Sequence, residues 1–145
     1  MTTDSQHFAQ LQANAARLKR QMLLDAQEAE SAKAAEFLHQ FVQSAAEKGL
    51  MPEPLFARGY GGKGRAKTPL KGWYLKNDHS LAVDTEGNYY ILTADLSVLD
   101  RLRGIRPQPS PPPLVLSQGG RDGESMDLTV KLSEILPTWR RGEGC

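Results

Sequence analysis

A long stretch without helix-breaking residues opens the chain. Residues 5–48 contain neither glycine nor proline and consist mainly of alanine, leucine, glutamine, glutamate, lysine and arginine. All six are good helix formers. Gly49 and Pro52 then supply a glycine and a proline of the kind that end helices. The sequence therefore predicts a long amphipathic helix over residues 1–51, about 65 Å long if it is unbroken.

The apolar residues in the first half of this helix form a narrow stripe. They recur at steps of three and four, with Ala15 at the centre, which is the a/d spacing of a coiled coil over about two heptads. We call the four larger ones the helix seam: Phe8, Leu11, Leu18 and Met22. The spacing predicts self-association or binding of a protein partner. Packing of this stripe on the chain's own domain is the alternative, and the sequence favours neither.

A second, broader stripe begins later in the helix and suits packing on a sheet. Between the two stripes, residues 25–35 offer only alanine to a core. An antiparallel helical hairpin is thus an alternative to one helix, although no turn residue marks a break. The second stripe comprises Ala34, Leu38, Phe41 and Ala45, widened by Phe37 and Val42.

Residues 52–104 change to a period of two and predict a small antiparallel β-meander followed by a short helix. Asn, Asp and Gly between the later strands suit tight turns. Leu81 and Val83 should share one face with either Tyr89 and Ile91 or Tyr90 and Leu92. The expected strands are 54–60, 70–76, 80–84 and 88–93, and the expected helix is 97–103.

Residues 105–145 read as a Pro/Gly-rich linker and a C-terminal segment. Prolines in 106–113 should prevent sheet pairing and give an extended polyproline II connector. An edge strand at 114–117, a helix at 125–136 and a loose tail at 139–145 are expected next. The predicted fold class is α+β: a long N-terminal helix (or helical hairpin) packed on a small antiparallel β-meander, with a Pro-rich linker and a short C-terminal helix.

The glycines at 59, 61 and 64 match G-x-G-x-x-G. A dinucleotide-binding fingerprint needs a helix directly after these glycines, so that the phosphates meet its N-terminus. Here residues 65–69 lead into a strand instead. The motif therefore predicts a flexible hairpin loop, not a nucleotide cradle.

The same region is strongly basic. Residues 57–76 hold six basic residues and no acidic one, interleaved with aromatics, and this combination suits single-stranded nucleic acid. Against it, residues 81–100 hold four acids and no base. Trp73 and Tyr74 are also adjacent on a strand, so at least one should be core. The alternative function is thus nucleic-acid binding through Arg58, Tyr60, Lys63, Arg65, Lys67, Lys71 and Trp73.

Other functions have little support in the sequence. The one cysteine is Cys145, and the three histidines lie apart, so we expect no disulfide, no metal site and no cofactor. Asp84 and Glu86 flank a turn and read as solvated acids, not a catalytic pair. No apolar run is long enough to span a membrane, and the N-terminus shows no secretory signal. We expect a cytoplasmic, bacterial, non-enzymatic binding protein with a formal net charge of +1.

Overall fold

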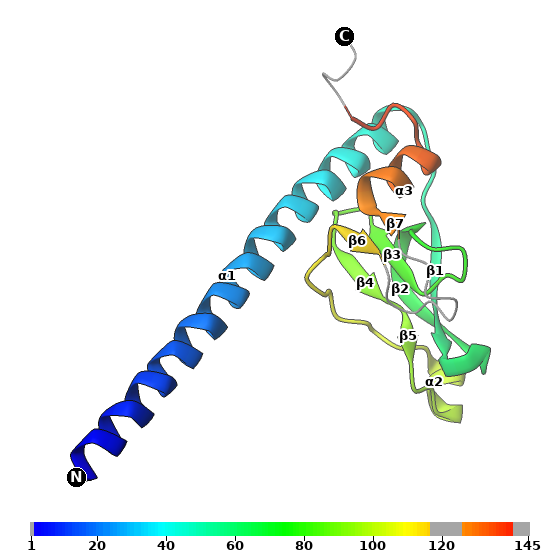
Figure 1. Ribbon diagram of the computed structural model, residues 1–145. Helices are drawn as coiled ribbons and strands as arrows, with labels where there is room; N and C mark the ends of the chain where they lie inside the picture. Colours follow the sequence, from blue (N-terminus) through cyan, green and yellow to red (C-terminus); the bar gives the residue numbers. More distant parts are fainter. Residues whose placement is uncertain (1, 117–125, 141–145) are drawn as a thin grey trace. The chain divides into compact units, whose positions relative to one another are not determined.

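A computed structural model describes residues 2–116 and 126–140 (Figure 1). It divides into two units, Met1–Glu30 and Ser31–Cys145. Helix α1 (Thr2–Glu47) is a single helix of 46 residues, so the long N-terminal helix is confirmed and the helical-hairpin alternative is not realised. The helix ends where the stop signals predict, because Gly49 has a positive φ of 74° and Leu50 N–H donates to the Ala45 carbonyl at 2.9 Å.

The second unit contains a five-stranded sheet with the order β4-β3-β2-β1-β5. Strands β1 to β4 pair antiparallel in sequence order, which confirms the meander, and β5 adds a parallel pairing with β1 that the sequence did not predict. The fold class is α+β. The strands are β1 (Glu53–Gly59), β2 (Arg65–Tyr74), β3 (Leu81–Asp84), β4 (Tyr89–Ile91) and β5 (Thr93–Ala94).

Strand β2 is longer than predicted and begins at Arg65, not at residue 70. Lys67 lies opposite Phe56, whereas Lys71 lies opposite Pro54, so β2 has two more residues than β1 over this interval. The irregularity contains Pro69, which has no backbone N–H and is tolerated in a strand at such a bulge. The predicted basic loop is therefore largely strand.

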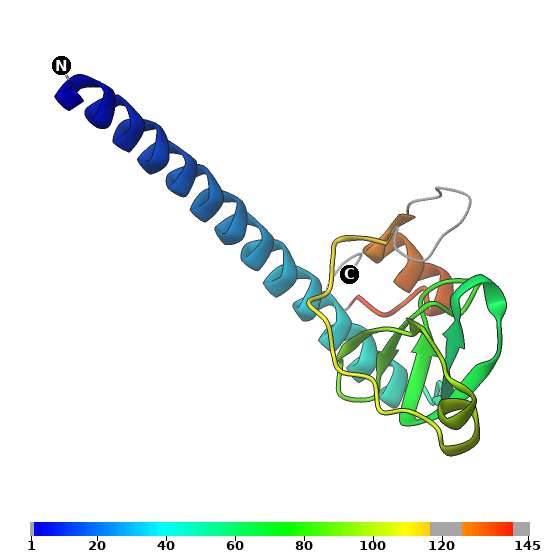
Figure 2. The ribbon, with the colours of Figure 1, turned by 90° about the horizontal axis from the view of Figure 1, so that it is seen from below.

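The main core lies on one face of this sheet. The second stripe of α1 packs there, as predicted (Figure 2), and the Phe41 ring meets the Trp73 ring edge to face with centroids 5.6 Å apart. Of the two alternatives for the strands, Tyr89 and Ile91 share the face of Leu81 and Val83. The fully or largely buried members are Ala34, Leu38, Phe41, Ala45, Trp73, Leu75, Leu81, Val83, Tyr89, Leu116, Leu128, Leu132 and Trp139.

Asp84 is buried, so its interpretation as a solvated acid is wrong, whereas Glu86 is exposed as expected. Its carboxylate accepts the backbone N–H groups of Glu86 and Asn88 at 2.9 Å each and the Tyr90 hydroxyl at 3.1 Å. An aspartate side chain at the end of a strand can accept hydrogen bonds from the backbone N–H groups of the tight turn that follows. Asp84 thus organises the β3–β4 hairpin and is not available for chemistry at the surface.

Two short elements follow the sheet. Helix α2 (Val98–Arg103) confirms the predicted helix and carries a capping box between Ser97 and Asp100. The proline-rich segment makes one β-bridge, which the sequence did not predict: Ser110 N–H donates to the Tyr89 carbonyl at 2.8 Å. Ser110 retains the amide that its proline neighbours lack.

The predicted edge strand does not pair with the meander. β6 (Val115–Leu116) forms a separate two-stranded sheet with β7 (Met126–Asp127). Helix α3 (Leu128–Ile135) confirms the short C-terminal helix, although it begins later than predicted. Leu128 and Leu132 of α3 join the same core as α1.

The expectation of a loose tail is wrong at Trp139. This side chain is 1% exposed and meets the Phe37 ring edge to face at 5.8 Å. Its carbonyl accepts the Ser44 hydroxyl at 2.6 Å, and its indole N–H donates to the Ser133 hydroxyl at 3.0 Å. A tryptophan buries a large apolar area, and its indole N–H usually finds a hydrogen-bond partner when buried, as it does here. Residues 141–145 lie outside the described residues.

Candidate binding surfaces

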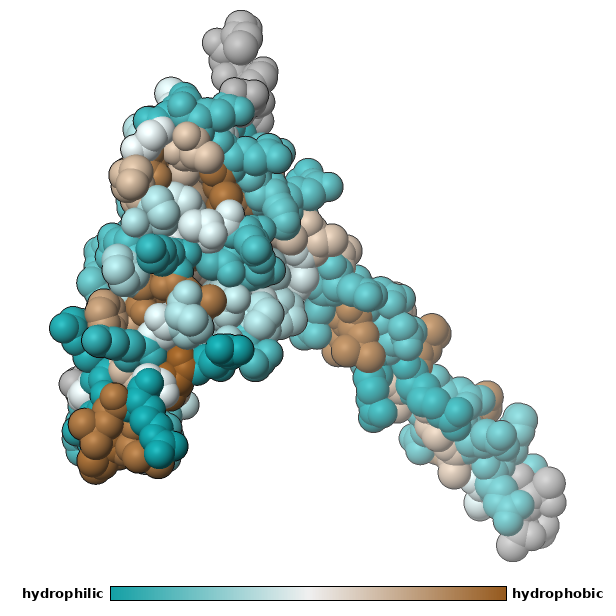
Figure 3. All heavy atoms as spheres, turned by 180° about the vertical axis from the view of Figure 1, so that it is seen from behind, coloured by the Kyte–Doolittle hydropathy of each residue, from teal (hydrophilic) through white to brown (hydrophobic). Residues whose placement is uncertain are grey.

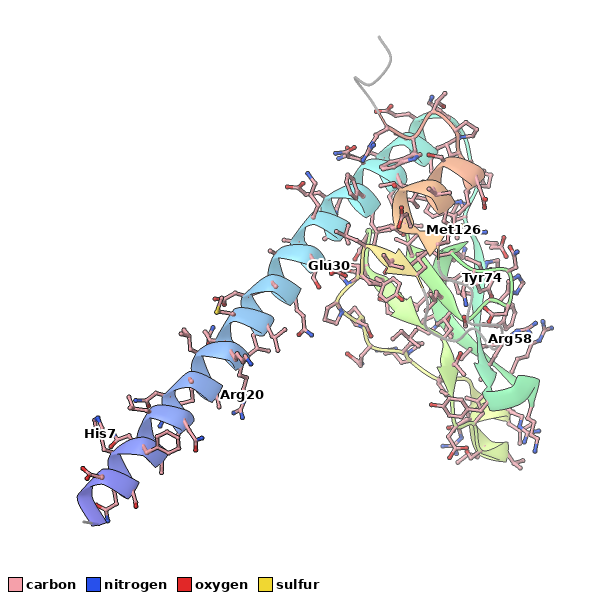
Figure 4. The ribbon with its side chains drawn as sticks, in the orientation of Figure 1. His7, Arg20, Glu30, Arg58, Tyr74 and Met126 are labelled. Carbon is pink, nitrogen blue, oxygen red and sulfur yellow. The ribbon has the colours of Figure 1, made fainter. Side chains whose placement is uncertain are left out.

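The helix seam lies in the first unit, where every described side chain from residue 4 to residue 30 is exposed (Figure 4). The seam residues are large and apolar, yet each is more than half exposed: Phe8 62%, Leu11 53%, Leu18 63% and Met22 63%. The narrow stripe seen in the sequence is thus an exposed apolar face of a helix.

The residues that flank the seam are mostly uncharged. At the e and g positions beside it stand His7, Gln12, Asn14, Lys19 and Gln21, of which Lys19 is the one full charge. Gln21 donates to Asp25 at 2.9 Å along the same helix. Flanks of this kind do not repel an identical helix strongly.

The second unit carries the predicted basic residues on the β1–β2 hairpin. Tyr60 is 63% exposed. It begins the short 3₁₀ turn Tyr60–Gly62, and the next strand follows, so the glycines form a hairpin loop as predicted. Arg58 is half-buried, and Arg65 opposite it places its guanidinium over the Phe56 ring at 4.5 Å. Exposed basic residues on this hairpin are Lys63, Arg65, Lys67 and Lys71.

Trp73 does not belong to this surface. The sequence included it as a candidate for stacking on bases, but it is 7% exposed and packs against Phe41 in the main core. Its neighbour Tyr74 is also unavailable for stacking on a base. Its ring stacks on His79, and its hydroxyl accepts the Phe56 N–H at 2.9 Å. Tyr60 is therefore the one predicted aromatic that a base could reach.

Sequence reasoning missed the arginines after the meander. Arg101 lies against the hairpin, because a Cβ built on Gly64 would come within 2.7 Å of its Cδ. Arg103 and Arg106 lie near Lys67 of β2, which is 36 and 39 residues earlier in the chain. The local signal was three arginines within six residues, but their proximity to the hairpin depends on tertiary structure.

These residues border a pocket of about 390 Å³ between β2 and the end of α2. No acidic residue lines it. The lining residues are Lys67, Thr68, Pro69, Arg103, Gly104, Ile105 and Arg106.

Helix α2 also presents an apolar surface beside the basic one. None of its residues is buried. Figure 3 shows apolar surface over this end of the second unit, where Val98, Leu99 and Leu102 are 69%, 54% and 79% exposed.

The titratable side chains in the described part of the chain form no candidate metal site. No group of three or more His, Cys, Asp or Glu side chains there could hold a metal ion. Burial raises the pKa of Tyr89 to about 12, and burial followed by the nearby Asp84 charge raises the pKa of Tyr90 to about 12. Both phenols are therefore protonated at neutral pH.

Among the described helices, none combines the length and apolarity required to cross a membrane. Comparison with known proteins yields no matching protein family, no matching curated protein and no matching solved structure.

Proposed function

We propose that the protein is a cytoplasmic, non-enzymatic binding protein that associates with a second copy of itself through the helix seam, as a short coiled coil. The observation that carries this proposal is the exposure of Phe8, Leu11, Leu18 and Met22 on one side of a helix whose described neighbours are all exposed. The single cysteine of the chain, Cys145, fits a reducing compartment.

Burial of the seam would be energetically favourable. Covering a Leu, Phe or Met side chain gains about 1.5–3 kcal/mol relative to leaving it in water. Most helical stability in proteins comes from packing of an apolar face, and the described side chains of residues 4–30 are all exposed. A partner on the seam would supply that packing.

A second copy suits this face better than a strongly charged partner. The flanking residues Gln12, Asn14 and Gln21 bring no charge, so two identical faces can meet with Lys19 as the only cation beside them. Ala15 at the centre leaves room for close approach. Because the seam spans only about two heptads, we expect a reversible, concentration-dependent association.

The test replaces Leu18 and Met22 by lysine together. We expect the wild-type protein to show a mass above that of one chain that increases with concentration, and the double variant to remain monomeric, because two charges would have to be buried. Light scattering coupled to size exclusion measures this mass over a range of concentrations.

The matched control replaces Ala13 and Leu24 by lysine. Both residues are exposed and, at 3.6 residues per turn, lie on the other side of the helix from the seam. The control adds the same charge and should associate as the wild type does. A wild-type monomer at all concentrations would reject the proposal, as would a seam variant of unchanged mass.

The second candidate function is binding of single-stranded nucleic acid by the hairpin. It is favoured by the exposure of Lys63, Arg65, Lys67 and Lys71 on one loop and strand, with Tyr60 exposed beside them. The structure adds Arg101 against the same hairpin. Cations can contact the phosphates while a base stacks on the tyrosine ring.

Salt dependence tests this second function. With four phosphate contacts, we expect the Kd for an oligothymidylate to rise about 50-fold between about 50 and about 200 mM salt, because each contact releases counterions. Fluorescence anisotropy of a labelled oligonucleotide gives this Kd. A Kd that does not change with salt would exclude phosphate contacts as the basis of binding.

A further inference from the structure

The pocket between β2 and the end of α2 has a charge that nothing in its lining balances. Lys67, Arg103 and Arg106 border it, and all three side chains are exposed. We propose that this pocket is a binding site for a phosphate group. The inference goes beyond the proposed self-association and is independent of the helix seam.

The acids near the pocket do not neutralise it. Asp100 is the acidic residue of α2, and its carboxylate accepts the Ser97 N–H at 3.0 Å in the capping box. No ion pair joins Lys67, Arg103 or Arg106 to an acid among the described residues. If Asp100 counts as one full negative charge and the last carbonyls of α2 as at most about half of one more, the three positive charges of the lining remain in excess. The net field in the pocket therefore favours an anion.

Backbone contacts bring the three cationic residues close together. Ile105 N–H donates to the Lys67 carbonyl at 2.8 Å, which ties the segment after α2 to β2. Gly104 has a φ of +88°, and a Cβ there would lie 2.7 Å from the Lys67 carbonyl oxygen, so glycine permits this close contact. Arg103 and Arg106 are thus positioned near Lys67 before any ligand arrives, which lowers the cost of binding.

The lining chemistry points to phosphate. Arginine presents a planar set of donors that matches phosphate oxygens, and lysine adds a compact charge. The volume of about 390 Å³ lies within the range of small-molecule sites, roughly 300–1,000 Å³. The pocket can therefore accept a small phosphate ester or a phosphodiester of a nucleic-acid strand, and both sources offer the same oxyanion.

The test uses inorganic pyrophosphate as the probe and the full-length chain. We expect saturable binding by titration calorimetry, with amide chemical-shift changes centred on residues 103–106 and Lys67. Replacing Arg103 by glutamine should weaken binding about tenfold or more, because a charged hydrogen-bonding partner is lost. Since Arg103 is exposed, the variant should unfold at the wild-type temperature.

The matched control is Arg101→Gln. Arg101 is on the same helix and carries the same charge, but it lies against Gly64 and does not line the pocket. This variant should bind pyrophosphate with an affinity within about twofold of the wild type. Equal weakening by Arg101→Gln and Arg103→Gln would show only a diffuse charge effect and would overturn the site, as would the absence of saturable binding at millimolar pyrophosphate.

A labelled oligothymidylate distinguishes the two sources of phosphate. Weaker oligonucleotide binding by Arg103→Gln supports the pocket as a contact to a nucleic-acid backbone. Pyrophosphate binding without oligonucleotide binding supports a small phosphate ligand and rejects the second candidate function. Oligonucleotide binding that Lys63→Gln weakens and Arg103→Gln leaves unchanged rejects the pocket as a contact to nucleic acid, and retains nucleic-acid binding on the hairpin.

Discussion

Replacement of Trp139 by alanine should lower the free energy of unfolding by about 3–5 kcal/mol, the usual cost of removing a buried large aromatic side chain. Trp139 is 1% exposed and contacts Phe37 edge to face. The substitution also removes the indole N–H that donates to Ser133 at 3.0 Å. The residue is only six positions from the end of the chain, so this effect would show that the C-terminal segment is part of the core.

Urea denaturation followed by circular dichroism and by fluorescence measures this loss. The chain has two tryptophans, so Trp73 in the main core remains as the fluorescent probe in the variant. Leu102→Ala is the control, because Leu102 is 79% exposed and should change the stability by no more than about 0.5 kcal/mol. A change of less than about 1 kcal/mol in Trp139→Ala would contradict the packing described for the C-terminal segment.

Gly72→Ala is expected to destabilise the second unit by about 3 kcal/mol or more, although it adds only one methyl group. Gly72 is buried on β2 opposite Asp84 of β3. A Cβ at this position would lie 1.9 Å from the Val83 carbonyl oxygen. Because that atom belongs to the backbone of a fully buried strand, the pairing of β2 with β3 would have to shift.

Gly49→Ala provides the comparison for this variant. Gly49 has a φ of +74° but nothing within 4 Å of its added Cβ, so only backbone strain of about 1–2 kcal/mol is expected there. Thermal and urea denaturation of both variants would separate crowding from strain. If Gly72→Ala were as stable as the wild type, the close approach of β2 and β3 at this position would be wrong.

The elements that sequence reasoning predicted well depend on local signals. Good helix formers without glycine or proline over residues 5–48 predict α1, and the steps of three and four at Ala34, Leu38, Phe41 and Ala45 identify the face that packs on the sheet. The β3–β4 hairpin follows from alternating apolar residues around a turn-forming sequence. Propensity, periodicity and turn chemistry are all properties of neighbouring residues.

The length of β2 and the burial of Trp139 depend on contacts between residues that are distant in the sequence. β2 begins at Arg65 because β1 pairs with it from there, whereas the sequence predicted a strand only from residue 70. Trp139 is buried because Phe37 and Ser44 of α1 meet it, 102 and 95 residues away along the chain. Such long-range packing can override local preference.

Among the candidate sites, too, one follows from local sequence and the others depend on tertiary structure. The helix seam was determined by the sequence alone, because residues at steps of three and four share one side of any helix. Only the tertiary structure removed Trp73 from the basic surface, since its strand could have presented either face to the core. Only the tertiary structure placed Arg103 and Arg106 beside Lys67, because the hydrogen bond from Ile105 to Lys67 joins segments that are 38 residues apart.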